Sequence, residues 1–148
     1  MSTSEIDHKY RTLATIWFIL LLSQFMFLGV VFAIKGEVFQ PDLTQPLLGS
    51  EPVIVAMFAV LAVTNFFLSF VFRKRSIDQA VAEQKISYVQ TGLVIGCALC
   101  ESISILGVVL AVVFSYPYFY AWFALGVIGI FLHFPRRKDL LAATYQQR

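Results

Sequence analysis

The chain is organised around one apolar stretch, Leu93–Val113, which reads LVIGCALCESISILGVVLAVV. As an α-helix it is long enough to cross a bilayer, which takes about 20 residues. One acidic residue, Glu101, stands at its middle, and every other acidic or basic residue lies at or beyond the end of an apolar run. A carboxyl group at that depth costs about 2.5–3.5 kcal/mol on insertion scales, so Glu101 is the first candidate for a functional residue. The alternative is a protonated Glu101 that hydrogen-bonds to a neighbouring helix and serves packing alone.

The composition is typical of a membrane protein. Of the 148 residues, 59% are apolar and 14% are charged, whereas a soluble domain has about 45–50% apolar and 25% charged residues. Four apolar runs are separated by polar segments and lack the alternation of a membrane barrel. We therefore expect an all-α, four-helix transmembrane bundle that forms a single domain, 1–148. The expected helices are 13–34, 53–72, 88–114 and 117–134, with an external loop at 35–52 and a polar helical linker at 73–90.

The basic residues predict the orientation. Ten of the 11 Lys and Arg residues lie before the first run, between the second and third runs, or after the fourth, and only Lys35 lies on the opposite side. Basic residues concentrate on the cytoplasmic side of membrane proteins. Both termini are therefore predicted to be cytoplasmic, in a multi-pass protein of the cell inner membrane. This topology accounts for the net charge of +2, so we expect the lipid bilayer and no nucleic acid as a partner.

Polar side chains from three of the expected helices lie at a similar depth. Burial disfavours the charged form of a carboxyl group, so Glu101 is predicted to hold H⁺, or a desolvated Na⁺ where enough oxygens surround it. If each polar group instead bonds separately to a backbone carbonyl, no such site exists. Depth follows from the sequence, but the direction in which each side chain faces does not. The candidate ion ligands are Glu101, Ser102, Asn65, Thr64 and Gln24, and Ser23 and Ser104 add hydroxyl groups in the same layer.

Small residues on the 88–114 helix predict close packing. They are Gly92, Gly96, Ala98 and Gly107, and small residues let membrane helices approach each other. We expect this helix to pack against its own bundle or against a neighbouring subunit. The protein is accordingly predicted to form a homo-oligomer or to associate with other membrane subunits.

Enzymatic chemistry is not expected, because the sequence contains no recognisable catalytic triad, phosphate-binding loop or metal cluster. Cys97 and Cys100 have the spacing of a redox or metal motif, but no second pair accompanies them, and we interpret them as small packing residues. His133 is interpreted as a residue of the membrane interface rather than as a ligand. No cofactor is expected apart from bound H⁺ or Na⁺.

The stretch around Glu101 resembles the second helix of the rotor proteolipid, subunit c, of rotary ATP synthases, which typically reads G-x-A-x-x-E-[AS]-x-x-[IL]-[YF]-G-L-V-x-A. In that family the carboxylate binds the transported H⁺ or Na⁺, and a Ser directly after it often accompanies Na⁺ binding. The resemblance implies that 53–72 and 88–114 form the proteolipid hairpin. The chain differs from the family in that 53–72 lacks the glycine repeat and two further helices flank the hairpin. The matching positions are Gly96, Ala98, Glu101, Ser102, Ile105, Gly107, Val109 and Ala111.

Two functions are compatible with these observations. The first is binding of H⁺ or Na⁺ at Glu101 within an ion-translocating, oligomeric assembly. The second is that of a non-catalytic accessory or assembly subunit of a larger membrane protein complex. The chemistry of Glu101 distinguishes them, because only the first function requires this residue to exchange an ion.

Overall fold

The computed structural model describes residues 3–40, 44 and 46–144, and this part of the chain contains helices and connecting segments but no strand. The all-α prediction is therefore confirmed. Positions 41–43 and 45 of the predicted external loop lie outside the described residues. The elements are α1 (Thr3–Lys35), the short 3₁₀ helix η1 (Gly36–Phe39), α2 (Pro52–Glu83), α3 (Ser87–Phe114), α4 (Tyr120–Leu132) and α5 (Arg137–Ala142).

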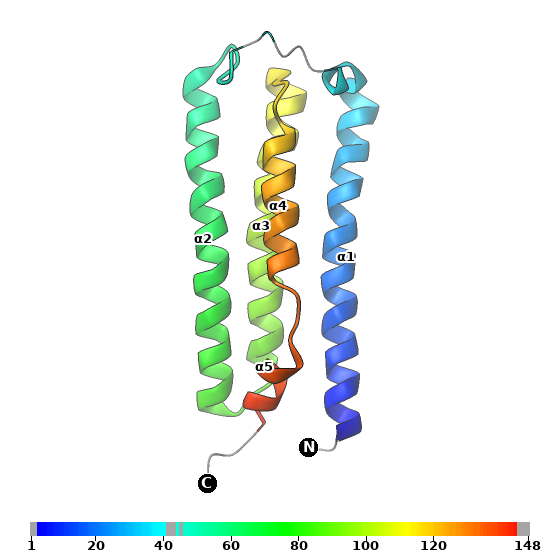
Figure 1. The fold of residues 1–148 in the computed structure, drawn as a ribbon, viewed down its shortest axis with the longest axis vertical. Helices are drawn as coiled ribbons and strands as arrows, with labels where there is room; N and C mark the ends of the chain where they lie inside the picture. The colour runs from blue at the N-terminus through cyan, green and yellow to red at the C-terminus, as the bar shows by residue number, and fades with distance from the viewer. Residues whose placement is uncertain (1–2, 41–43, 45, 145–148) are drawn as a thin grey trace.

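The central helix of the bundle is α3, which packs against α1, α2 and α4. In Figure 1, α1 and α2 stand on opposite sides of α3 and α4. The described ends of the chain lie at the same end of the bundle, which we call the terminal end, and η1 lies at the opposite end. The stretch that carries Glu101 therefore contacts three other helices, and α3 is the most buried of the three long helices.

Three helices, α1, α2 and α3, are long and apolar enough to cross a membrane, which indicates an integral membrane protein. The outer faces of α1 and α2 carry large apolar side chains that are exposed within the described part of the chain, among them Phe18, Met26, Val60 and Phe67. In water such a surface would be unfavourable, whereas hydrocarbon solvates it well. These faces therefore identify the sides of the bundle that contact lipid.

The fourth apolar segment differs from the prediction of a helix over 117–134. Helix α4 has 13 residues, so at 1.5 Å per residue it is only about 20 Å long, shorter than the ~30 Å of bilayer hydrocarbon. It ends at Leu132 because Pro135, which has no N–H, cannot continue it and disfavours helical backbone at Phe134. The chain then runs on without helical structure to α5, whose Leu140 is buried against the bundle.

The cytoplasmic linker predicted at 73–90 is formed by the continuous end of α2, a turn, and the start of α3. Helix α2 extends beyond its apolar part to Glu83. Gln84 then adopts a left-handed conformation with φ 54°, which reverses the chain, and the amide of Lys85 donates to the carbonyl of Ala80 at 3.1 Å. The reversal makes α2 and α3 an antiparallel hairpin.

The glycines predicted to allow close packing are in contact within the chain itself. A Cβ atom at Gly92 would lie 2.6 Å from the Cβ of Ser76, and one at Gly107 would lie 2.9 Å from the Cβ of Trp122. Gly96 is covered in the same way by His133. Ala98, by contrast, is exposed on the outer face of α3. Of these four predicted packing residues, only Ala98 is thus left for contact with a neighbouring subunit.

Two clusters of buried apolar side chains enclose the middle of the bundle. One lies toward η1 and includes Ile103, Leu110 and Phe119, and the other lies toward the terminal end and includes Leu93 and Ile130. Polar side chains of α1, α2 and α3 lie between them. The candidate site is therefore a polar layer between two apolar layers, where hydrogen bonds are protected from competing water.

Candidate functional site

Glu101 lies at the middle of α3 and faces α1. Its carboxyl oxygen Oε1 is in hydrogen-bond contact with the hydroxyl of Ser23, and the same hydroxyl lies 2.7 Å from the carbonyl oxygen of Leu20, one turn earlier in α1. The side chain is only partly buried. A regular helix α1 holds Ser23 in place, so the contact joins two rigid elements rather than a loop.

The hydroxyl of Ser23 can serve as a hydrogen-bond partner for either form of Glu101. A hydroxyl group donates one hydrogen bond but accepts up to two. When Glu101 is protonated, its O–H donates to Ser23 Oγ, and Ser23 in turn donates to the Leu20 carbonyl. When Glu101 is ionised, its carboxylate oxygen accepts the Ser23 hydroxyl proton, and the Leu20 carbonyl keeps the backbone N–H of Gln24 as its partner within α1. The contact with Ser23 is therefore compatible with either form of the carboxyl group.

A second polar pair lies next to the first along the contact between α1 and α3. The hydroxyl of Ser104 donates to Oε1 of Gln24, and both side chains are almost completely buried. Glu101 and Ser104 are three residues apart on α3, and therefore lie on the same side of that helix. The Nε2 group of Gln24 is buried without a hydrogen-bond partner among the described residues, so this side chain retains a free donor inside the bundle.

The remaining predicted ligands do not join Glu101. Asn65 of α2 donates from Nδ2 to Ser102 Oγ at 2.8 Å, and Ser102 donates to the carbonyl of Leu99 at 2.7 Å. Thr64 is exposed and donates to the carbonyl of Val60 in its own helix at 2.8 Å. The structure thus divides the predicted layer into two pairs toward α1 and one pair toward α2, and leaves Thr64 outside all three. The division arises because adjacent residues of a helix, such as Glu101 and Ser102, point in different directions.

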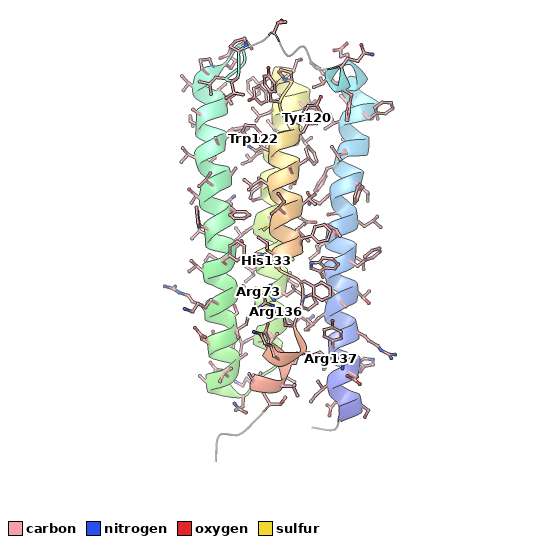
Figure 2. The ribbon with its side chains drawn as sticks, viewed as in Figure 1. Arg73, Tyr120, Trp122, His133, Arg136 and Arg137 are labelled. Atoms are coloured by element: carbon pink, nitrogen blue, oxygen red, sulfur yellow. The ribbon has the colours of Figure 1, made fainter. Side chains whose placement is uncertain are left out.

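His133 is placed differently from the interpretation as an interface residue. Its side chain is fully buried, its Nδ1 lies 2.7 Å from the carbonyl of Gly129, and its ring lies 4.7 Å from that of Phe70. A Cβ at Gly96 would be 2.5 Å from its Cδ2 atom. The physical reason is the early end of α4, which leaves His133 between α2 and α3 instead of beyond the bundle. Figure 2 shows it inside the helix ends, above Arg73.

The two cysteines, Cys97 and Cys100, are buried free thiols. Within the described residues no group of three His, Cys, Asp or Glu side chains could hold a metal ion.

Trp17 has a role in helix packing that the sequence did not predict. Its indole N–H donates to the carbonyl of Ile130 at 2.7 Å and thereby links α1 to α4. A Trp near a membrane edge is common, so its position alone did not indicate this bond.

Glu101 is also close to the outer face of α3. Ala98 and Ile105, which lie three residues before and four residues after it on the same side of the helix, are both exposed. The small side chain of Ala98 leaves Glu101 reachable from outside the bundle. The carboxyl group is thus in contact with α1 on one side and accessible to lipid or to a neighbouring protein on the other.

Comparison of the chain with protein-family models, with curated proteins and with solved structures found no match. We therefore infer function from the site.

Proposed function

We propose that this integral membrane protein holds an exchangeable proton on Glu101 at the middle of the membrane, as part of an ion-translocating, oligomeric assembly. The observation that carries the proposal is the position of Glu101 at the middle of the apolar helix α3, where it is partly buried, contacts the hydroxyl of Ser23 and forms no ion pair within the described part of the chain. A carboxyl group is retained in hydrocarbon at a cost, and proton relays are one of the uses that justify this cost.

Proton binding is favoured over Na⁺ binding by the number of oxygens near Glu101. A desolvated metal cation takes several oxygen ligands. Ser23 supplies one hydroxyl oxygen, while Ser102 and Asn65 bond to each other on the side of α2. The α1 side thus offers Glu101 a hydrogen-bond partner rather than a cage of ligands. The cargo proposed here is accordingly H⁺.

The exchange of the proton is proposed to occur through the outer face next to Ala98 and Ile105. A partner subunit, either a second copy or another membrane protein, would meet Glu101 there, because Gly96 and Gly107 are already covered by the chain's own α4 segment. The resemblance to subunit c remains part of the proposal for the α2–α3 hairpin, in which the acid lies on the second helix. A ring of copies would have to form through the face of Ala98 rather than through the glycines.

Labelling with a hydrophobic carbodiimide tests this proposal. Such a reagent modifies a protonated carboxyl group that is accessible from lipid. We expect one adduct per chain on Glu101, located by mass spectrometry of peptides from detergent-purified protein, and none on the Glu101→Gln variant. We also expect added NaCl to leave the labelling rate unchanged relative to KCl at equal ionic strength.

Two results would contradict this expectation in different ways. Protection by Na⁺, but not by K⁺, would show that the site binds the metal cation instead of the proton. An unreactive Glu101 in folded protein would remove the exchange step and leave the role of a non-catalytic accessory or assembly subunit.

We also propose that the segment 117–134 returns the chain to its starting side, so that both termini are cytoplasmic in a cell inner membrane. The support is the ten-to-one distribution of basic residues. In addition, both described ends of the chain lie at the same end of the bundle. A reporter protein that is active only in the cytoplasm should be active when fused after Arg148. If only a reporter that works in the periplasm were active at this position, the assigned orientation would be wrong.

A further inference from the structure

A hollow at the terminal end of the bundle combines basic side chains with an apolar border. It has a volume of about 450 Å³ and lies between α2, the end of α4 and α5. Four cationic side chains border it, two from α2 and two from the segment that follows α4. These are Arg73, Lys74, Arg136 and Lys138. Residues far apart in the sequence thus bring positive charge to one concave surface.

One of these cations is already used by the fold. Arg73 donates to the carbonyls of Leu132 at 3.3 Å and Phe134 at 3.0 Å, and lies 3.6 Å from the carboxylate of Asp139. Arg73 therefore stabilises the segment at the C-terminal end of α4 and neutralises Asp139, one of the two acidic residues at the hollow. Figure 2 shows Arg136 close to Arg73, whereas Arg137 points toward α1. There Arg137 pairs with Asp7 at 3.3 Å, so it does not contribute to the hollow.

The other three cations, Lys74, Arg136 and Lys138, are exposed and form no ion pair within the described part of the chain. Asp78 is the remaining acid at the rim, so the hollow has two more positive than negative charges. The guanidinium groups of Arg73 and Arg136 also repel each other. A bound anion would relieve this repulsion and neutralise the excess charge.

The position of the hollow specifies the kind of anion. Phe70 and Leu132 border it where the apolar part of α2 ends; Leu132 is exposed and continues the lipid-facing surface, while Phe70 is partly buried beside His133. A ligand that fits both parts has a negatively charged head and an apolar tail. We propose that this hollow binds one anionic phospholipid, with the phosphodiester between Lys74, Arg136 and Lys138 and an acyl chain along Phe70 and Leu132. Basic pockets between membrane helices are suited to such headgroups.

Native mass spectrometry of the detergent-purified full chain tests the site. The protein is titrated with phosphatidylglycerol, which is anionic, and with phosphatidylcholine, which is zwitterionic. We expect one tightly bound phosphatidylglycerol and much weaker binding of phosphatidylcholine. The double variant Arg136→Gln/Lys138→Gln should lower the affinity for phosphatidylglycerol by about 30-fold, given the contribution of each basic side chain near an anionic lipid.

The matched control is Arg11→Gln/Arg75→Gln, which removes two exposed charges from the terminal end without changing the hollow. It should retain the wild-type affinity. An equal loss in both double variants would overturn the site, because the binding would then depend only on net charge. Equal binding of the two lipids, or displacement of phosphatidylglycerol by inorganic phosphate at equal concentration, would overturn the choice of ligand. If the pocket variant does not fold, the single variant Lys74→Gln replaces it, and unchanged affinity there would contradict the proposal.

Discussion

In the Glu101→Gln variant we expect an unchanged fold and oligomer mass but complete loss of ion flux in proteoliposomes. The amide is close in size to the acid, and its oxygen can accept from the Ser23 hydroxyl as Glu101 Oε1 does. It cannot release a proton at any accessible pH, so a transport cycle that passes through Glu101 stops. Measurement combines native mass, thermal unfolding and proton uptake for the variant and the wild type side by side.

Two further variants separate a transport role from a packing role. Ser23→Ala removes the partner hydroxyl and should cost about 0.5–1.5 kcal/mol of stability, while flux is altered but not abolished. Glu101→Asp should transport at an intermediate rate, because the shorter side chain withdraws the acid from α1. Full flux in Glu101→Gln would show that this acid only packs the helices, and the proposal of an exchangeable proton would have to be abandoned.

The Gly126→Ala variant is expected to lose about 1–3 kcal/mol of stability, the usual cost of overpacking a tight interior. A Cβ at Gly126 would lie 2.9 Å from the carbonyl oxygen of Cys100 and would also collide with Ser104 Oγ. The first of these neighbours is backbone of α3, so it cannot move aside at low cost. The substitution would therefore push α4 away from α3 and open the bond between Ser104 and Gln24.

Gly29→Ala is the control for this prediction, because no atom lies within 4 Å of a Cβ at that position. It adds the same methyl group to a helix, without a neighbour to displace, and should leave the stability unchanged or slightly higher. The buried thiols of Cys97 and Cys100 allow both variants to be followed by their reaction with a thiol-specific dye during heating. Equal unfolding temperatures for the two variants would show that α3 and α4 are not packed as closely as described.

The class of the fold could be predicted from hydrophobic length and composition. Long apolar runs in lipid must satisfy their backbone internally, so α1, α2 and α3 followed from the sequence. The length of α4 did not follow so directly. Its apolar residues continue past Leu132, but the helix ends there because Pro135 disfavours helical backbone at the residue before it. This one boundary also decided the position of His133.

For the candidate site, the sequence determined that an acid, two amides and several hydroxyls lie at a similar depth, because depth along a helix follows from the rise of 1.5 Å per residue. Only the tertiary structure decided which of them meet. Glu101 contacts Ser23, while its neighbour Ser102 contacts Asn65 on another helix. The rotation of each helix about its own axis depends on packing against its neighbours, above all on the glycines of α3 and α4, and that information lies in contacts between residues far apart in the chain.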